Sequence, residues 1–316
     1  MSSEKMALFV EKIKNYFAKQ PLPHAAFHLT SRYISGIHVS PKDKRVTNHF
    51  ILPLEKGLIR PSFEKKNIQN PPLLEKKIKK ELGKLHLHDH RVACLLPELS
   101  IKAFVFSFDS LPSSRPEREQ IIRFRIKKQI PLLPEDARFS FDVIKSDDSI
   151  KIFVAVVRVS VIREYEELFS KLNLKIRTVG VPTLSLHSLL NTEKEKDSLL
   201  INIEEDSISL AAIVDSEIAL YRMKAILSIS QDEASEIRRI ESIVKEVENT
   251  VNFVEDREKK KIQSFWVRVG LSKEEGILSH LRERLSLPVA GIESCLTAKL
   301  GSREKKILSP LIGQIR

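Results

Sequence analysis

Two short turns between predicted strands carry the residues that bear most directly on chemistry. The first, residues 27–36, has the sequence FHLTSRYISG, and the second, residues 200–209, has the sequence LINIEEDSIS. Turns that hold a phosphate need glycine, because a Cβ prevents backbone N–H groups from closing on an anion. The second turn instead presents three successive carboxylates, those of Glu204, Glu205 and Asp206. We therefore expect neither turn to bind a phosphate well.

Other groups of reactive residues are sparse. The run His86-Leu87-His88-Asp89-His90 is a dense histidine cluster between a predicted helix and a strand, and a solvated connection explains it better than a metal site. Cys94 lies in an apolar strand and is expected to be a small buried hydrophobe. No G-x-S-x-G elbow, P-loop or G-x-G-x-x-G motif is present. The sequence predicts no catalytic residue, no cofactor and no metal site.

Composition indicates a soluble globular protein with an acidic partner. The chain has 316 residues, 42% of them hydrophobic and 30% charged, with a net charge of +11. Its nine glycines compare with about 22 expected from average usage, which argues against several glycine-rich loops. The two cysteines provide no disulfide framework, and no secretory leader or membrane-spanning run is evident. We expect a cytoplasmic protein that meets anionic lipid, nucleic acid or an acidic protein face.

The basic segments leave two alternatives open. A short amphipathic helix within residues 1–21 either lies on a membrane surface or docks on its own domain. The runs 76–80 and 257–261 are either solvated helix ends or part of a basic surface. The cations of the predicted helix 116–129 wrap around it, without aromatic side chains arranged for base stacking, so we do not expect nucleic-acid binding.

The two halves of the chain repeat one pattern of elements. Three strands, a helix and a strand are predicted at 25–29, 34–39, 45–52, 71–84 and 92–96, and again at 199–203, 208–214, 217–223, 232–255 and 264–269. A second helix follows at 274–286 in the later half. Such a repeat predicts two related α/β lobes that face each other across a cleft. The apolar residues of helix 232–255 follow a 3,4 spacing, and we expect them to pack on the second lobe's sheet in preference to forming a coiled coil.

The material between the halves predicts a small inserted α+β subdomain. The expected division of the chain is as follows: an N-terminal helix (1–21), the first lobe (22–97), the insert (98–175), a return to the first lobe (176–197), the second lobe (198–300) and a C-terminal helix (301–316).

Residues 121–144, IIRFRIKKQIPLLPEDARFSFDVI, resemble the inserted subdomain of the type IV pilus assembly PilM family. Other landmarks agree with this family in order and spacing. They are the Leu-Pro pairs at 96–97 and 111–112, the second turn with its following strands, and the C-terminal segment 310–316. The resemblance covers about residues 22–316. It implies an actin-like (ribonuclease H-like) α/β fold with two lobes and an insert, similar to that of the cell-division protein FtsA. The cytoplasmic domain of type II secretion GspL proteins is a close variant.

The nucleotide motif of this family is degenerate at every position that we can match. In the first turn the family's Asp, Gly and Lys fall on His28, Thr30 and Ser35. In the second turn its Asp and Gly fall on Asn202 and Glu204. Its late Gly-Gly pair falls near Val269, which leaves the single glycine Gly270.

These departures predict that ATP binding is lost or very weak. Two unit charges about 6 Å apart at an effective dielectric constant near 20 repel by roughly 3 kcal/mol, whereas micromolar affinity corresponds to only about 8 kcal/mol in total. Carboxylates facing a polyphosphate would cancel much of that energy, unless they held Mg²⁺. The alternative function is an actin-like ATPase of the same machinery that retains nucleotide binding.

The resemblance therefore implies a non-catalytic cytoplasmic scaffold of a type IV pilus or type II secretion-like assembly, peripherally associated with the inner membrane. The expected partner is the cytoplasmic N-terminal segment of a PilN-like bitopic inner-membrane protein. An assembly ATPase and an anionic membrane surface are further candidate partners. A longer gene product with a transmembrane helix beyond residue 316 would favour the GspL variant.

Overall fold

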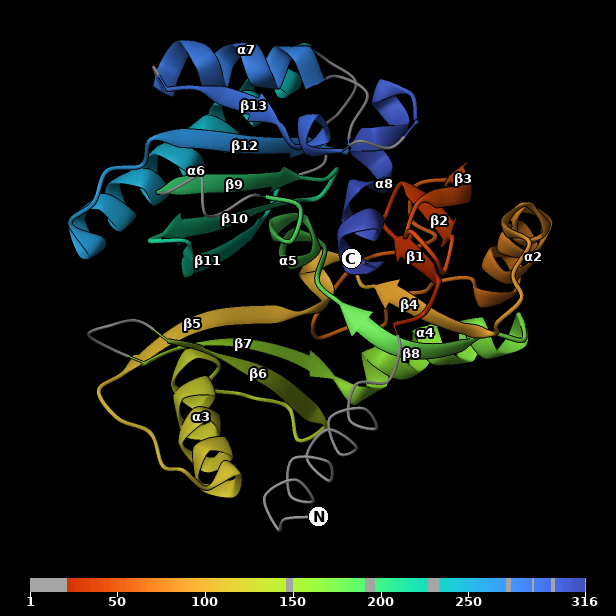
Figure 1. Ribbon diagram of the computed structural model, residues 1–316, viewed down its shortest axis with the longest axis horizontal. Coiled ribbons are helices and arrows are strands. Elements are labelled where there is room, and N and C mark those ends of the chain that lie inside the picture. The colour runs from red at the N-terminus through yellow and green to blue at the C-terminus, as the bar shows by residue number, and fades with distance from the viewer. Residues whose placement is uncertain are drawn as a thin grey trace, which may run out of the picture.

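A computed structural model describes residues 22–145, 150–190, 197–226, 233–270, 274–285, 287–296 and 299–315. The helix predicted within residues 1–21 lies outside the described residues. The described chain forms two five-stranded sheets and one three-stranded sheet. Figure 1 shows the smaller sheet below the second large sheet and beside the first. Among the helices of the described chain, none combines the length and the apolar character needed to cross a lipid bilayer.

The first five-stranded sheet has the strand order β3-β2-β1-β4-β8. Its strands and helices are β1 (Ala25–Leu29), β2 (Tyr33–Val39), β3 (Val46–Pro53), α2 (Pro71–Leu82), β4 (Arg91–Leu95), α4 (Val159–Lys171) and β8 (Lys175–Gly180). β2 is antiparallel to β1 and β3, whereas β4 is parallel to β1 and β8. All of β1 and most of β4 are buried, which explains their continuous apolar sequences.

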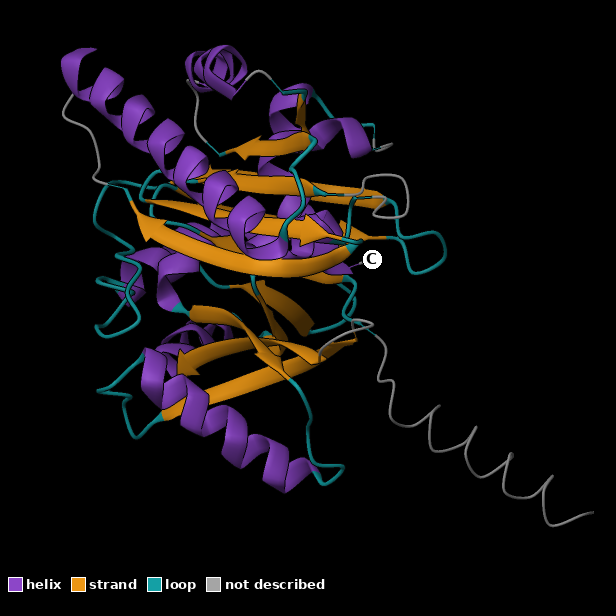
Figure 2. Cartoon of the chain, turned by 90° about the vertical axis from the view of Figure 1, so that its left-hand side faces the viewer, coloured by secondary structure: helices purple, strands orange, loops and turns teal. Residues whose placement is uncertain are grey.

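The second five-stranded sheet repeats the first strand by strand, in the order β11-β10-β9-β12-β13. Its elements are β9 (Ser198–Ile203), β10 (Ser207–Val214), β11 (Glu217–Ala225), α6 (Glu233–Glu258), β12 (Ser264–Val269), α7 (Glu274–Leu285) and β13 (Val289–Gly291). The internal repeat predicted from the sequence is therefore confirmed. Helix α6 lies across one face of this sheet (Figure 2) and buries Ile240, Val244 and Val247 against it, as predicted, whereas Ile237 remains 48% exposed.

The insert follows β4 and forms the three-stranded sheet with one helix against it. Its elements are β5 (Lys102–Phe108), α3 (Arg115–Gln129), β6 (Ala137–Lys145) and β7 (Ile150–Arg158), and the strand order is β5-β7-β6. α4 falls within the range 98–175 expected for the insert, but its buried side chains Val161, Tyr165 and Phe169 join the core of the first sheet. α4 thus occupies the place in the first lobe that α7 occupies in the second.

Two helices, which pack against each other, connect the lobes. α5 (Pro182–His187) leads from the first lobe to the second, and α8 (Ser302–Ile315) returns to pack on β1, β2 and β4. A Cβ at Gly313 would overlap the carbonyl oxygen of Ser185, so glycine permits the close approach of α8 to α5. The core of the first lobe also includes Leu200, Ala211 and Tyr221 from the second sheet. The core of the first lobe therefore extends onto the second sheet, which forms a separate hydrophobic cluster with α6 and α7.

Asp136 joins the insert to the start of α4. Its carboxylate accepts hydrogen bonds from the backbone N–H of Ser160 (3.0 Å) and from Nε of Arg158 (2.8 Å). The hydrogen bonds from Ser160 and Arg158 hold the pKa of Asp136 at about 2, below its ordinary value of 3.8. A depressed carboxyl pKa contributes stability above the unfolded-state pKa, and that contribution is lost as the pH falls toward the folded-state pKa.

We predict that Asp136→Asn lowers the free energy of unfolding by about 1 kcal/mol at pH 7. The deficit should shrink as the pH is lowered through the window between about 4 and 2, because the wild-type carboxylate is then protonated as well. Urea unfolding at several pH values measures both quantities. Asp142→Asn, an exposed position on β6, is the matched control. A deficit that is independent of pH would contradict the assignment.

Candidate functional site

The turn between β1 and β2 uses its backbone donors internally. The Thr30 hydroxyl accepts hydrogen bonds from the N–H groups of Arg32 (3.2 Å) and Tyr33 (2.9 Å). The N–H of Thr30 itself donates to the carbonyl of Tyr33 (2.9 Å). These three N–H groups are already paired, so they cannot form the nest of donors that holds a phosphate.

Glu204, in the turn between β9 and β10, points into the protein. The sequence predicts that it faces an incoming polyphosphate as one of three free carboxylates, and the structure corrects this. Glu204 is only 5% exposed, accepts a hydrogen bond from the Tyr33 hydroxyl (2.8 Å) and forms an ion pair with Arg268. A buried carboxylate is very costly without a partner, which explains why it turns toward the cation and not toward solvent.

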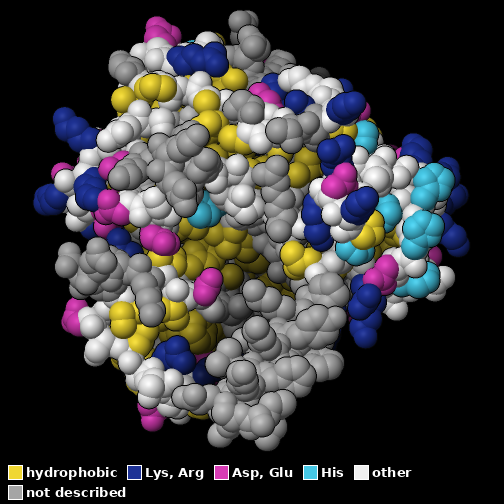
Figure 3. Space-filling model, viewed as in Figure 1, with side chains coloured by type: hydrophobic (Ala, Val, Ile, Leu, Met, Phe, Trp, Pro, Cys, Tyr) yellow, Lys and Arg dark blue, Asp and Glu magenta, His cyan; other side chains and the backbone are white. Residues whose placement is uncertain are grey.

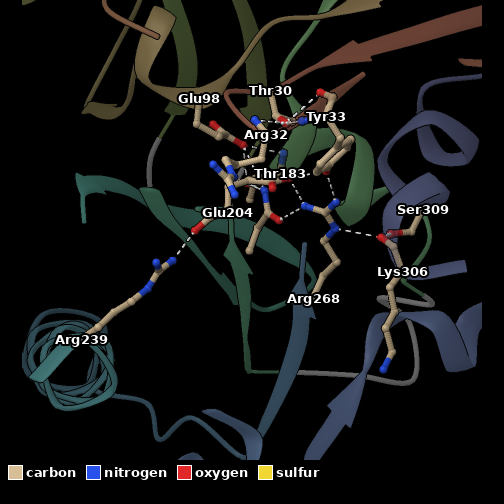
Figure 4. Close-up of polar contacts among 11 residues, drawn as sticks. Thr30, Arg32, Tyr33, Glu98, Thr183, Glu204, Arg239, Arg268, Lys306 and Ser309 are labelled. Atoms are coloured by element: carbon tan, nitrogen blue, oxygen red, sulfur yellow. Dashed lines mark hydrogen bonds and ion pairs between the residues drawn. The ribbon is translucent and has the colours of Figure 1, made fainter. Parts of the chain in front are cut away.

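Arg268, in β12, is the centre of this buried network and is fully enclosed. Its Nη1 donates to Glu204 and to Oδ1 of Asn202 (2.9 Å). Its Nη2 donates to the Tyr33 hydroxyl (2.6 Å), and its Nε donates to the carbonyl of Lys306 (2.9 Å). Figure 4 shows how one guanidinium joins the second sheet to β2 and to α8. Burial opposes the charged form of Arg268, but the charges and hydrogen bonds of Glu204 and Tyr33 together outweigh burial and raise the pKa of the guanidinium.

A second buried network surrounds Glu98, in the short helix Glu98–Ser100 that follows β4. One carboxylate oxygen accepts hydrogen bonds from the N–H (2.8 Å) and the hydroxyl (2.5 Å) of Thr183, and the other accepts from the Tyr221 hydroxyl. Burial raises the pKa of Glu98, and these hydrogen bonds oppose the shift. The amide of Asn202 donates to the Thr183 hydroxyl (3.1 Å), so Asn202 links the two networks.

His28 and Ser35 lie opposite each other on β1 and β2. Both are fully buried, and neither the two ring nitrogens nor the hydroxyl has a hydrogen-bond partner. Burial and then the charge of Arg268 lower the pKa of His28 well below 6.5, so the imidazole is neutral at pH 7. A neutral ring and a hydroxyl thus stand where the family motif has a carboxylate and an ammonium group.

Gly270 follows β12 and lies directly against Glu204. A Cβ at this position would overlap the Glu204 carboxylate, and the Gly270 N–H donates to the carbonyl of Ile203 (2.8 Å). The resemblance implies that this glycine lies under a nucleoside. In this chain it makes room for the Glu204 side chain instead.

A cavity of about 620 Å³ remains between the two turns at the mouth of the cleft. Its walls carry both signs of charge, from Arg32, Lys56 and Arg60 on one side and from Glu205 and Asp206 on the other. Burial raises the pKa of Asp206. Mixed charge of this kind does not complement a polyphosphate. Among the residues that the structure describes, no three His, Cys, Asp or Glu side chains are grouped so that they could hold a metal ion.

The remaining candidates from the sequence lie away from the cleft. The His86–His90 run forms the connection before β4, and the rings of His38 and His88 are 6.3 Å apart on the surface. Cys94 is fully buried in β4, as predicted, and burial raises the pKa of its thiol. Sequence reasoning missed Tyr33, Glu98, Thr183 and Arg268 as site residues. The signal available was a single arginine inside the apolar strand SFWVRV, since a buried arginine needs a buried partner.

The sequence matches no protein-family model and no curated protein, whereas the fold matches many solved structures. A chain of a PilM-PilN type IV pilus biogenesis complex aligns with a TM-score of 0.75 and 15% identity, over 94% of this chain and 97% of that chain. A Bacteroides thetaiotaomicron protein with an actin-like ATPase fold and unknown function aligns with a TM-score of 0.54 and 10% identity, over 91% and 94%. The chain described here has an actin-like fold.

The cytoplasmic domain of EpsL, an inner membrane component of the type II secretion system of Vibrio cholerae, also shares this actin-like fold. It aligns with a TM-score of 0.50 and 10% identity, over 91% of this chain and 94% of that chain. The predicted resemblance is thus confirmed at the level of the fold, for the pilus protein and for the secretion protein. In this actin-like fold the space between the lobes contains the Arg268 network.

We predict that Arg268→Met lowers the free energy of unfolding by about 3–5 kcal/mol, because it leaves the Glu204 carboxylate buried without a cation. The double substitution of Arg268→Met with Glu204→Met should recover much of that loss, since no uncompensated charge then remains. Urea unfolding of the single and double variants gives the coupling energy. Arg115→Ala, which breaks an exposed pair with Glu119, should change the stability by no more than about 0.5 kcal/mol. Additive effects at 204 and 268 would contradict the interpretation.

Proposed function

We propose that this chain is a non-catalytic scaffold of a type IV pilus or type II secretion-like inner-membrane assembly. The observation that carries the proposal is the Arg268–Glu204 network, which occupies the space between the lobes with the protein's own side chains. The paired donors of the Thr30 turn support it further. A protein with such a site acts by holding partners and not by turning over a nucleotide.

The groove best suited to a partner lies between the insert and the second lobe. It has a volume of about 570 Å³ and is lined by residues of β5, of the segment after α3, and of β11. Figure 3 shows hydrophobic side chains gathered in the hollow between β11 and β5. Apolar lining comes from Phe104, Ile130, Leu132 and Met223, and charged side chains of Lys102, Arg222 and Glu64 stand among them. An extended peptide with apolar anchors fits this composition.

Both walls of the groove are strand edges. β5 is an outer strand of the three-stranded sheet, and β11 is an outer strand of the second five-stranded sheet. An outer strand has backbone donors and acceptors on one side that no neighbouring strand uses. The two edges contact each other over part of their lengths, so we expect a peptide to bind chiefly by placing its side chains in the groove beyond that contact.

The partner that we propose is the cytoplasmic N-terminal segment of a PilN-like bitopic membrane protein. The structure most similar in fold among those described above is that of a PilM-PilN complex. On this proposal the chain works in the cytoplasm and is held peripherally at the inner membrane, where its net charge of +11 favours anionic lipid. The similarity to EpsL supports the type II secretion variant of the same function.

Peptide binding tests the groove. We predict that a labelled peptide with the sequence of the neighbouring bitopic protein's cytoplasmic segment binds the full chain in fluorescence anisotropy, and that Met223→Asp weakens binding at least tenfold. Leu132→Asp on the opposite wall, where the side chain is 92% exposed, should act similarly without a risk to folding. Ile237→Asp, at an exposed apolar position on α6, is the control. Equal affinity of the wild type and both groove variants would exclude this groove.

Calorimetric titration with Mg²⁺-ATP tests the absence of a nucleotide site. We expect no heat of binding at millimolar nucleotide, because binding would require the Arg268–Glu204 pair to separate in a desolvated site. The double variant Glu204→Gln with Arg268→Lys, in which the ion pair is weakened, is the comparison for this titration. A dissociation constant in the micromolar range for the wild-type chain would overturn the scaffold proposal and favour an active ATPase.

A further inference from the structure

Helix α3 presents an unusual combination of side chains at the outer edge of the molecule (Figures 1 and 2). It buries only Ile122 and Ile126 against the three-stranded sheet. On the side facing away from the sheet, Phe124 is 58% exposed, and Leu132, three residues beyond the helix, is 92% exposed. Single exposed apolar side chains are common on protein surfaces, so what distinguishes this stretch is their combination with neighbouring cations.

Within the stretch of chain that carries these apolar side chains the charged residues are all positive, and Glu64 lines the groove together with Leu132. Residues 120–134, QIIRFRIKKQIPLLP, contain four cations and no carboxylate. The arginines lie over the sheet, because the guanidinium of Arg123 is 5.1 Å from the Phe139 ring and that of Arg125 is 5.3 Å from the Phe108 ring. The exposed Lys127 and Lys128 remain beside Phe124, whose ring is 4.6 Å from the Lys128 ammonium group.

We propose that the C-terminal half of α3, with Phe124, Lys127, Lys128 and Leu132, is a membrane-binding surface for anionic lipid headgroups. An exposed phenylalanine and an exposed leucine on an outer helix and the loop after it can enter the interfacial region of a bilayer, and neighbouring lysines can bind lipid phosphates there. The two apolar groups are separate, so they match a deformable bilayer better than the packed face of a protein partner.

The position of this surface deepens the proposed function, on which it rests. Leu132 also lines the groove proposed for the partner's cytoplasmic segment. A segment that continues directly into a transmembrane helix can reach only a groove close to the bilayer. Binding of α3 to lipid headgroups would place the groove there, at the side of the molecule where the partner emerges.

Vesicle binding tests the proposal with the full chain alone. We expect co-sedimentation with vesicles containing about one third phosphatidylglycerol and little with pure phosphatidylcholine. The double substitution Lys127→Glu and Lys128→Glu should lower the partition coefficient at least tenfold, since each lysine near an anionic surface contributes about 1 kcal/mol. Phe124→Ser should lower it severalfold, with the charge unchanged.

The matched control is the double substitution Lys79→Glu and Lys80→Glu on α2, which makes the same change of charge at exposed positions elsewhere. An equal loss in this control would show that net charge alone drives binding and would overturn the assignment to α3. The assignment to α3 would also be overturned if the α3 substitutions left vesicle binding unchanged, or if the wild-type chain did not bind anionic vesicles. Loss of a protein partner from the α3 variant, with vesicle binding intact, would assign the surface to that partner instead.

The peptide assay separates this proposal from the proposed function. Peptide binding without vesicles should be unaffected by the substitutions at Lys127 and Lys128, and vesicle binding should be unaffected by Met223→Asp. Normal peptide binding together with absent vesicle binding would refute only the membrane surface. The reverse result would refute only the groove.

Discussion

The ion pair between Arg268 and Glu204, with the Tyr33 hydroxyl hydrogen-bonded to both, is the buried interaction by which the second lobe contacts the first inside the cleft. Both side chains are removed from water, and neither can be tolerated there without the other. The remaining donors of the guanidinium bind Tyr33, Asn202 and the carbonyl of Lys306, which belong to three different parts of the chain. A change in the angle between the lobes would break several of these hydrogen bonds at once. Arg268 and Glu204 both belong to the second lobe, so the Tyr33 hydroxyl and the Lys306 carbonyl are the groups that tie this pair to the first lobe and to α8.

This constraint changes what an actin-like fold can do. In such a fold a ligand between the lobes can couple its own binding to their relative movement, because its contacts differ between the open and closed arrangements. Here the contacts between the lobes are made by the chain itself, and Tyr221 and Leu200 extend the apolar core across the boundary. On the proposed function, the fold instead offers the groove between β5 and β11 to an extended segment of a partner.

The elements could be predicted from the sequence, whereas the site could not. Apolar runs such as AAFHL and SLLINI predict buried strands, and Asn70 before Pro71-Pro72 marks the start of α2, because these signals lie within a few residues of one another. The network joins Tyr33 to residues 171 and 235 positions away, and no local pattern reports that distance. The role of the Thr30 hydroxyl depends on the shape of its turn. The placement of α4 was missed because its amphipathic pattern does not identify the sheet on which it packs.

The two proposed contacts, with a peptide and with anionic lipid, would together recruit the chain selectively. A short peptide in a groove of about 570 Å³ loses conformational entropy on binding, and a few lysines with two apolar side chains bind a bilayer weakly. When both contacts involve the same membrane, the second becomes intramolecular and gains from a high effective concentration. Two weak interactions then give stable attachment only where the partner and anionic lipid occur together. The groove and α3 stay close to each other because Ile130 and Leu132, which line the groove, directly follow α3 in the chain.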